Sequence, residues 1–279
     1  MDFKDKTVII TGGSEGVGAA TARAFAEVGA NLLLVARTKK NLEKIAGELR
    51  GKTRVEIVAA DVSDPDGIAN LFKKAHYEFG AVHILVNNAG FHRRGLFETV
   101  SSEDLARIID VNLKAPIVLC RHAIPYLREA GGGAIVNVGS LAGRTPVPGS
   151  ATYSASKSGL RAFTYAIAEE LRGSSIKVAV VSPGPIDTGF IMSDIDRVTD
   201  LTFSQPLSTA DEVAREILKL CGNDKAERSM PPISGLLTTL TYLFPGLGRF
   251  MRPLLERKGR NTKRKLKARM REAAAKETP

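Results

Sequence analysis

Cysteine is scarce in this sequence, which has only two, Cys120 and Cys221, among 279 residues. Both lie within apolar patterns of helical spacing. Two such residues do not make a disulfide framework, so we expect a protein of the reducing cytoplasm. The first six residues run directly into an apolar strand and are too few and too charged for a secretory signal peptide.

Metal-ligand spacing and biased segments are missing as well. His76, His83 and His122 do not have the spacing of metal ligands, and we expect no metal site. Apolar residues make up 43% of the chain and charged residues 25%, without internal repeats. This composition is that of a globular protein, and it excludes the disordered and fibrous classes.

Positive charge is concentrated at the C-terminal end. Of a net charge of +10, residues 257–279 contribute +8, because they hold ten Lys and Arg against two acids. The rest of the chain is therefore close to neutral, and a partner attracted by charge would meet this tail. The tail has no aromatic residues between its cations, so we expect no nucleic-acid partner.

Short apolar runs alternate with segments of helical spacing. The runs expected to be strands are Thr7–Thr11, Asn31–Ala36, Arg54–Ala59, Ile84–Asn87, Ala134–Val138 and Lys177–Ser182, with a short last one at Glu227–Met230. Repeated strand–helix–strand units predict an α/β fold with a doubly wound parallel sheet of Rossmann type. We expect a single domain over residues 1–232, followed by a C-terminal helical extension over residues 233–279.

A glycine-rich turn follows the first expected strand. It reads Thr11-Gly12-Gly13-Ser14-Glu15-Gly16-Val17-Gly18, and a helical pattern comes directly after it. Glycines permit the tight turn and let the backbone approach a pyrophosphate, while the helix N-terminus supplies N–H groups. In this strand–turn–helix context, Gly12, Gly16 and Gly18 predict a dinucleotide site.

The end of the second expected strand distinguishes the two nicotinamide dinucleotides. An NAD site usually carries an acidic residue there, which holds the ribose 2′-hydroxyl. This sequence has Arg37 and Thr38 at that point and no acid. A guanidinium can form a forked contact with a 2′-phosphate, and Thr38 and Ser14 can donate hydrogen bonds to it. We therefore predict NADP as the cofactor.

The motifs together resemble those of the short-chain dehydrogenase/reductase family. The resemblance covers about residues 6–190, in the family's order and spacing, and rests on the glycine turn, Asp61-Val62, Asn87-Asn88-Ala89-Gly90, Asn112, Ser140, Tyr153-Ser154-Ala155-Ser156-Lys157 and Pro183-Gly184-Pro185-Ile186-Asp187-Thr188. The cofactor contacts that it implies are Asp61 and Val62 at the adenine ring, Asn88 and Ala89 at its ribose, and Ile186 and Thr188 at the nicotinamide carboxamide.

The same resemblance implies a catalytic set, which consists of Asn112, Ser140, Tyr153 and Lys157. Tyr153 and Lys157 are four residues apart on an expected helix, so they share a face. A free phenol titrates near pH ~10, and we expect the Lys157 ammonium to lower the pKa of Tyr153 toward the working pH. Ser140 can donate a hydrogen bond to the substrate oxygen. The resemblance also places Lys157 at the nicotinamide ribose and has Asn112 order a water chain from Lys157.

The substrate pocket is expected to be formed by three loops, Phe91–Phe97, Arg144–Thr152 and Phe190–Pro206. None of them carries a decisive chemical signature. His92 follows closely after Gly90, and we interpret it as pocket rim or surface, because the Ser140, Tyr153 and Lys157 set leaves it no required catalytic role.

The C-terminal extension departs from the family pattern, since it lacks the final Gly-Gly signature of many members. Its leucines and Phe244 predict one apolar helical face, made of Leu236, Leu237, Leu240, Leu243, Phe244 and Leu247. Prolines and glycines in this stretch argue against a membrane-spanning helix. Three alternatives stay open: peripheral contact with an anionic membrane, a helix packed over the substrate pocket, and a subunit contact.

These observations predict an NADP-dependent oxidoreductase that reduces a small, lipophilic ketone or aldehyde. The NADP preference favours reduction, and the apolar extension favours a lipophilic substrate, as in the lipid- and steroid-acting branches of the family. An oxidative alcohol or hydroxysteroid dehydrogenase is the alternative enzyme, and a cofactor-binding scaffold is the alternative of another class. We expect a cytoplasmic homo-oligomer, with membrane association depending on the role of the extension.

Overall fold

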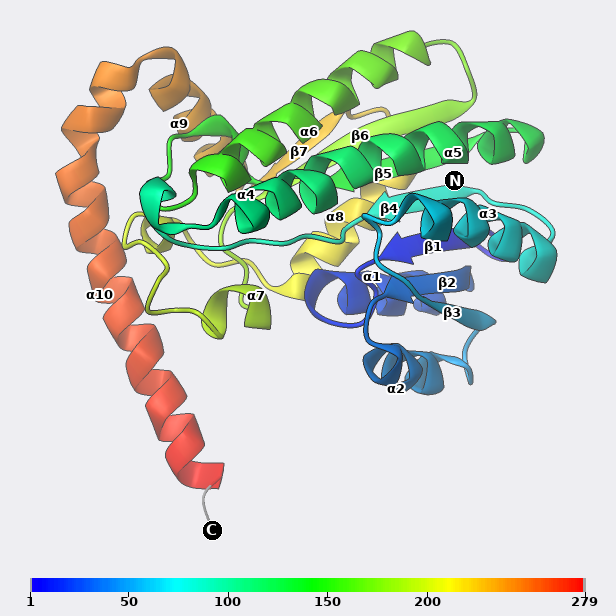
Figure 1. Ribbon diagram of the computed structural model, residues 1–279, viewed down its shortest axis with the longest axis horizontal. Coiled ribbons are helices and arrows are strands. Elements are labelled where there is room, and N and C mark those ends of the chain that lie inside the picture. Colours follow the sequence, from blue (N-terminus) through cyan, green and yellow to red (C-terminus); the bar gives the residue numbers. More distant parts are fainter. Residues whose placement is uncertain (1, 278–279) are drawn as a thin grey trace.

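A seven-stranded parallel sheet forms the centre of the structure, a computed structural model that describes residues 2–277 (Figure 1). Its strands are β1 (Thr7–Thr11), β2 (Asn31–Ala36), β3 (Val55–Ala59), β4 (Ile84–Asn87), β5 (Gly133–Val138), β6 (Ile176–Pro183) and β7 (Glu227–Met230). Their order is β3-β2-β1-β4-β5-β6-β7, and neighbouring strands pair in parallel. The predicted doubly wound Rossmann-type fold is therefore confirmed, with strand ends within two residues of those expected.

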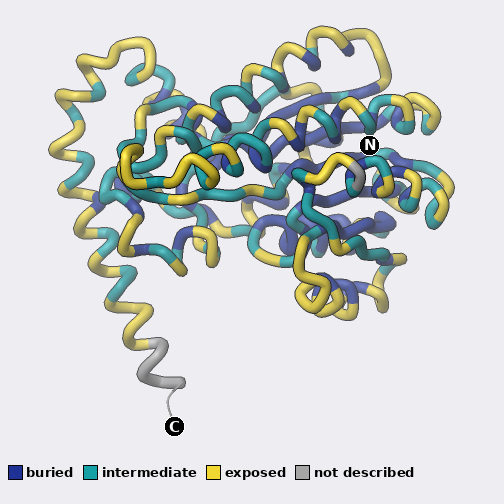
Figure 2. The backbone as a smooth tube through the Cα atoms, in the orientation of Figure 1, coloured by how far each residue is buried: buried dark blue, intermediate teal, exposed yellow. Residues whose placement is uncertain are grey.

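Helices cover both faces of the sheet because alternate residues of each strand point to opposite sides. On β1, Val8 and Ile10 join a core with helices α1 (Gly16–Glu27), α2 (Lys39–Leu49) and α8 (Ala210–Gly222). Ile9 of the same strand joins a second core with α3 (Pro65–Phe79), α5 (Ala115–Glu129) and α6 (Ala151–Glu170). Figure 2 shows this buried centre between exposed outer helix faces. A capping box starts α8, because Thr209 and Glu212 exchange hydrogen bonds.

The direction in which successive strands join the sheet reverses between β1 and β4. The segments that follow these two strands therefore leave the sheet toward opposite faces. A crevice at the carboxyl ends of the strands is the usual ligand site of such a sheet. Around that edge lie the short helices α4 (Ser102–Ile109) and α7 (Gly189–Met192), with a 3-10 turn at Thr202–Ser204.

The C-terminal extension forms two helices, α9 (Pro232–Leu243) and α10 (Pro245–Glu277). The prediction of one continuous apolar face over residues 236–247 was wrong, because the chain turns at Phe244 and α10 begins at Pro245, whose nitrogen has no hydrogen to donate. Residues 278–279 of the predicted extension lie outside the described residues. No helix within residues 2–277 is long and apolar enough to cross a membrane.

Helix α10 is fixed along the segment that follows α7. Lys263 donates from Nζ to the backbone oxygen of Val198 at 2.7 Å, and Arg260 pairs with Asp200 at 3.1 Å. Gly259 is buried at the crossing, where a Cβ atom would overlap the carbonyl oxygen of Asp200. The long red helix at the side of Figure 1 is therefore packed on the domain over part of its length.

Candidate active site

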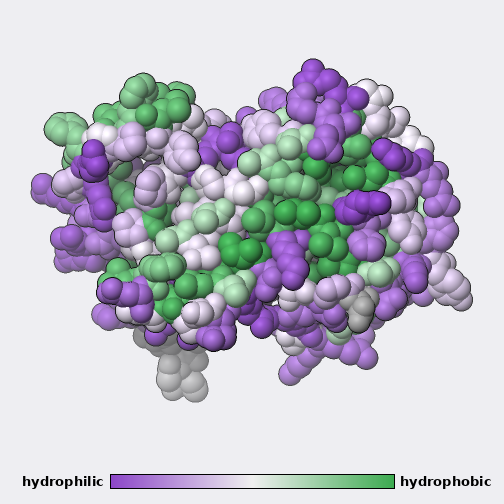
Figure 3. Space-filling view, turned by 45° about the horizontal axis from the view of Figure 1, so that its top comes forward, coloured by the Kyte–Doolittle hydropathy of each residue, from purple (hydrophilic) through white to green (hydrophobic). Residues whose placement is uncertain are grey.

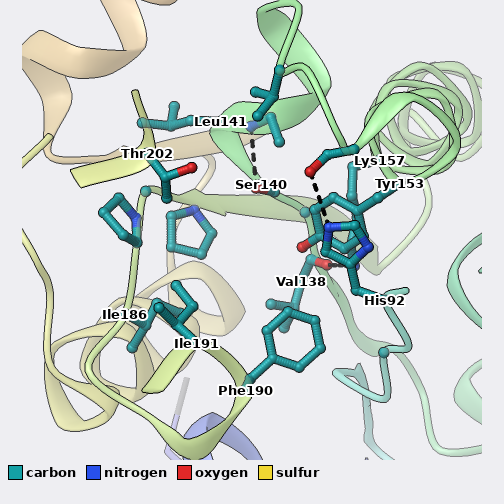
Figure 4. A pocket seen from close by; sticks show the side chains of 18 of the residues that line it. His92, Val138, Ser140, Leu141, Tyr153, Lys157, Ile186, Phe190, Ile191 and Thr202 are labelled. Atoms are coloured by element: carbon teal, nitrogen blue, oxygen red, sulfur yellow. Dashed lines mark hydrogen bonds between the residues drawn. The ribbon is translucent and has the colours of Figure 1, made fainter. Parts of the chain in front are cut away.

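One cavity of about 640 Å³ lies at the carboxyl edge of the sheet. It is lined by nearly all of the residues predicted for the cofactor, namely Gly12, Ser14, Gly16, Arg37, Thr38, Asp61, Val62, Asn88, Ala89, Lys157, Ile186 and Thr188. Ser140 and Tyr153 line the same cavity (Figure 4). The fold thus brings together residues up to 176 positions apart in the sequence.

The glycine turn has the shape that a close-approaching phosphate group requires. Gly12 and Gly16 have φ angles of 65° and 52°, a region that suits residues without a Cβ atom. Gly16 opens toward Thr188, whose Cγ2 would lie 3.6 Å from an added Cβ. Gly18 does not line the cavity; it packs beneath the turn, where a Cβ would fall 2.6 Å from the Nδ2 atom of Asn88. The turn therefore fits a dinucleotide pyrophosphate.

The side chain of Asn88 holds this turn to the sheet. Its Nδ2 atom donates to the backbone oxygens of Thr11 at 2.9 Å and Gly12 at 3.2 Å. The Thr11 hydroxyl in turn accepts hydrogen bonds from the backbone N–H groups of Asn88 and Ala89, each at 3.0 Å. Asn88 therefore fixes the glycine turn and also lines the cavity.

Two charged residues of opposite sign, Asp61 and Arg37, line the β2 and β3 end of the cavity, and only Asp61 forms an ion pair among the described residues. Asp61 pairs with Arg107 at 3.0 Å and accepts from the backbone and hydroxyl of Ser63 at 2.9 and 2.6 Å. Burial acts to raise the pKa of Asp61, but the hydrogen bonds from Ser63 and the nearby Arg107 lower it below its usual value. Arg37 has no ion-pair partner among the described residues, so its guanidinium is available to a ligand.

Lys157 and Tyr153 project from one face of α6 toward Ser140, which follows β5 (Figure 4). The Lys157 Nζ atom donates to the backbone oxygen of Val138 at 2.7 Å and lies 5.8 Å from the centre of the Tyr153 ring. Burial lowers the pKa of Lys157 to about 8, because desolvation disfavours the ammonium. This lysine can therefore exchange a proton near neutral pH.

The predicted lowering of the Tyr153 pKa was wrong for the protein without a bound ligand. Burial raises the pKa of the Tyr153 phenol, and hydrogen bonding to Ser140 and the charge of Arg94 oppose this only in part. Lys157 is not among the groups that lower it, and its Nζ atom donates to the Val138 oxygen. The phenol is thus held in its protonated form, which is the form that can donate a proton.

Asn112 does not line the cavity, and its side chain is bound to the loop after β4. It lies in a π-helical turn at Asp110–Lys114, is fully buried, and accepts from the backbone N–H of Phe91 at 2.7 Å. Its Nδ2 atom donates to the Phe91 oxygen at 2.8 Å and to the Ser156 hydroxyl at 3.2 Å. Asn112 therefore fixes the start of the loop after β4 and has no direct bond to Lys157 in the described structure.

His92 lines the cavity beside Tyr153 and is partly buried, so its interpretation as plain surface was wrong, whereas a place in the pocket wall agrees with the pocket-rim interpretation. Its ring stacks on the Tyr153 ring, with centroids 4.4 Å apart, and its Nε2 atom lies 3.0 Å from the Ser150 hydroxyl. Burial, assisted by the charge of Arg94, lowers the pKa of His92 to about 3, so this imidazole is neutral at physiological pH. Sequence gave no signal for this contact, because it joins a loop to the start of a distant helix.

The three loops expected at the pocket do line it. They supply Phe91, His92 and Arg94 from the first, Thr145, Pro146, Val147 and Ser150 from the second, and Phe190, Ile191, Val198, Leu201, Thr202, Ser204 and Gln205 from the third. Arg94 joins two of these loops, since it donates to the Phe190 oxygen at 3.0 Å and pairs with Asp194 at 3.4 Å.

The C-terminal extension completes the cavity wall. From α9 come Leu237, Thr238 and Thr241, and from α10 come Pro245, Gly248, Arg249, Met251, Arg252 and Leu255. Packing over the pocket, one of the three alternatives for the extension, is therefore observed. The sequence pattern predicted an apolar helical face in the extension. It did not predict what this face contacts, because the contacts depend on how α9 and α10 fold back over the edge of the sheet.

Comparison with known proteins agrees with this geometry. The family model for short chain dehydrogenases matches residues 6–198. An oxidoreductase of Staphylococcus saprophyticus is 35% identical over 220 residues, which cover 78% of this chain and 86% of that protein. A 3-oxoacyl-[acyl-carrier-protein] reductase of Thermotoga maritima is 33% identical over 231 residues, covering 81% of this chain and 94% of that protein.

A solved structure gives the same result. A short chain dehydrogenase from Burkholderia cenocepacia in complex with NADP superimposes with a TM-score of 0.74 and 29% identity, covering 82% of this chain and 97% of that one. The family match spans more than half of the sequence and includes Ser140, Tyr153 and Lys157. The protein therefore belongs to the short chain dehydrogenase family and is an oxidoreductase.

Proposed function

We propose that this oxidoreductase uses NADPH to reduce a lipophilic ketone or aldehyde. The observation that carries the proposal is the single cavity along the carboxyl edge of the sheet. Arg37 lies where this edge passes β2, Ser140 where it passes β5, and the apolar wall of α9 and α10 lies beyond β7. The proposed 2′-phosphate site and the apolar wall thus line the same cavity as the Tyr153 phenol.

The residues around the glycine turn fit NADP better than NAD. Arg37 and Thr38 line the cavity, and neither residue at this point is acidic. We propose that Arg37, Thr38 and Ser14 bind the 2′-phosphate, with the remaining cofactor contacts as predicted from the family motifs. The NADP in the similar Burkholderia cenocepacia structure supports this assignment. Bound NADPH would supply the hydride for the carbonyl carbon.

We propose Tyr153 as the acid that protonates the carbonyl oxygen. Its raised pKa keeps the proton on Oη until a negatively charged oxygen develops beside it. Ser140 lies next to the phenol and would donate a hydrogen bond to the same oxygen. Lys157, whose burial lowers its pKa to about 8, would return a proton to Tyr153 after turnover, and Asn112 would order a water chain from Lys157 that resupplies this proton.

The lipophilic character of the substrate is proposed from the cavity wall. Leu237, Met251 and Leu255 of the extension face the same space as Tyr153. The name of the Thermotoga maritima relative adds a specific candidate class, 3-oxoacyl thioesters, which carry a ketone on an acyl chain. We further propose a homo-oligomer of the cytoplasm, since Cys120 and Cys221 are both free and buried, and Ile117 and Tyr165 are exposed on adjacent helices.

Consumption of NADPH, followed at its nicotinamide absorbance, tests the proposal. The panel should contain aliphatic ketones and aldehydes of increasing chain length, a steroid ketone and a 3-oxoacyl thioester. We expect kcat/KM to rise with apolar chain length and NADPH to be preferred over NADH. Equal rates for short polar carbonyls would contradict the lipophilic assignment, and turnover only of alcohols with NADP would favour the oxidative alternative.

A further inference from the structure

The extension has two apolar faces, and only one of them is used by the cavity. Leu237 and Met251 line the cavity. On the outer side of the same two helices, Leu243, Phe250 and Leu254 are 63%, 85% and 69% exposed. Residues on a helix that covers a pocket need only one apolar face, so the second face has no role in the chain's own core.

The outer apolar residues gather at the turn between α9 and α10. Figure 3 shows them as a hydrophobic cluster at one end of the molecule, above a hydrophilic strip that belongs to α10. We name this cluster the apolar corner; it consists of Leu236, Tyr242, Leu243, Phe244, Phe250 and Leu254, each exposed by more than half. A contiguous exposed patch of this kind marks a contact site more often than plain surface.

The same side of α10 becomes cationic beyond the apolar corner. Steps of three and four residues lead from Phe250 and Leu254 to Arg257, then Asn261, then Arg264 and Lys265, and this spacing places them on one stripe. Arg257, Arg264 and Lys265 are exposed and have no ion pair within the described part of the chain. The apolar corner thus continues directly along α10 into a basic stripe, which consists of Arg257, Arg264 and Lys265.

The cationic side chains on the two sides of α10 differ in whether they form ion pairs. On the inner side, Arg260 pairs with Asp200, and Lys267 pairs with Asp196. Glu256 is the one acid in the sequence between residues 247 and 271, and it pairs with Arg252. The outer stripe therefore presents positive charge without internal compensation, which is what an anionic surface attracts.

We propose that the apolar corner and the basic stripe of α10 dock this protein on an anionic lipid bilayer. The apolar side chains enter the boundary between headgroups and acyl chains, and the stripe contacts anionic headgroups. A face that only meets water, or that binds a second copy of the chain, does not require a basic stripe in line with the apolar corner. The helices that carry the apolar corner also form part of the cavity wall, so docking would place the cavity that contains Tyr153, and its lipophilic substrate, beside the bilayer. This last consequence rests on the proposed function, whereas the docking itself does not.

Flotation with vesicles tests the docking on the full chain. Vesicles of phosphatidylcholine alone are compared with vesicles that also contain phosphatidylserine, over a series of salt concentrations. The variant Leu243→Glu/Phe250→Glu removes the apolar corner, and Arg264→Glu/Lys265→Glu reverses part of the stripe. Tyr77→Glu, at an 85% exposed aromatic on α3, and Lys44→Glu/Lys73→Glu are the matched controls.

We expect the wild-type chain to float with the anionic vesicles and to be released as salt rises, because screening shortens the reach of charge. The corner and stripe variants should each lose binding by about tenfold or more, while both controls float like the wild type. NADPH affinity should be unchanged in all variants, which shows that they are folded.

Three results would overturn the proposal. The first is a wild-type chain that stays in the soluble fraction with anionic vesicles at low salt. The second is a Leu243→Glu/Phe250→Glu variant that floats normally, and the third concerns the size of that variant. If that variant instead sediments as a smaller species without lipid, the corner is a subunit contact and the membrane proposal is wrong. None of these outcomes depends on carbonyl turnover, so failure of the docking and failure of the proposed function can be told apart.

Discussion

The imidazole of His92 lies flat against the phenol of Tyr153, with ring centroids 4.4 Å apart and an angle of 15° between the planes. His92 is at the same time anchored through the Ser150 hydroxyl at 3.0 Å. Because the imidazole covers one face of the phenol, it contributes to the burial that raises the pKa of Tyr153. We therefore regard His92 as a positioning residue for the proposed acid.

Replacing His92 tests this role. His92→Ala should lower kcat/KM by about two- to tenfold, the size expected for loss of a stacked aromatic pair, whereas His92→Phe should stay close to wild type. Reduction requires a protonated Tyr153, so the rate falls at high pH as the phenol ionises. In His92→Ala this fall should shift to lower pH, because water reaches the phenol. Identical pH profiles for His92→Ala and wild type would show that the ring does not act on Tyr153.

The cofactor preference depends on Arg37. Arg37→Asp removes the guanidinium and restores the acid typical of NAD sites, so the ratio of kcat/KM for NADPH to that for NADH should fall by roughly 100-fold or more. Lys40→Asp makes the same charge change on the exposed start of α2, outside the cavity, and should leave the ratio nearly unchanged. If both variants shift the ratio equally, general electrostatics and not a specific contact governs the preference.

The packing of α10 depends on Gly259. In Gly259→Ala the new methyl group would overlap the Asp200 carbonyl oxygen, so α10 must move away from the loop that lines the cavity. We expect a severalfold rise in the KM of the carbonyl substrate with little change in the Kd of NADPH. Gly246→Ala, on the same helix with no atom within 4 Å of the added carbon, is the control. An unchanged KM in Gly259→Ala would mean that α10 does not shape the substrate site.

Acid sensitivity should come in part from Glu227, which lies at the base of the extension. Burial acts to raise its pKa, but hydrogen bonds from Arg144, Arg161, Ser182 and Tyr165 lower it to about 2, from a usual value of 4.5. The folded pKa is depressed, so this carboxylate stabilises the protein above pH 4.5, and the contribution is lost as pH falls toward 2.

Urea unfolding of Glu227→Gln measures this contribution. At pH 7 the variant should lose about 3 kcal/mol of unfolding free energy, because the largely covered guanidinium of Arg144 loses its partner, while the half-exposed Arg161 is partly solvated. The difference from wild type should shrink as pH falls below 4.5. A difference that is constant from pH 7 to pH 3 would show that the carboxylate charge is not what stabilises the network.

The sheet could be predicted because most of its strands are buried on both faces. Leu32 is fully buried on one side of β2, and Leu33 and Val35 are fully buried on the other, so a continuous apolar run was the correct signal. The motifs around Gly12 and Tyr153 could be recognised because their residues stand at short, fixed spacings in the sequence. Their arrival in one cavity follows from the parallel order of strands.

Features that depend on contacts between distant segments could not be predicted. The stack of His92 on Tyr153 joins residues 61 positions apart, and nothing in the local sequence encodes it. The direction of the Tyr153 pKa shift was missed because the spacing to Lys157 says nothing about the burial of the phenol. The break at Phe244 splits a face that looked continuous when residues were placed on one ideal helix.

The central claim is that the Tyr153 phenol donates the proton in carbonyl reduction, and Tyr153→Phe tests it most directly. The substitution removes one oxygen atom and keeps the ring that stacks on His92, so folding and NADPH binding should persist. The decisive measurement is kcat/KM for NADPH-dependent reduction of the best carbonyl substrate, together with the Kd of NADPH. The account predicts a fall in kcat/KM of roughly 1,000-fold or more with the Kd within about twofold of wild type. A variant that keeps kcat/KM within about tenfold of wild type would contradict the account.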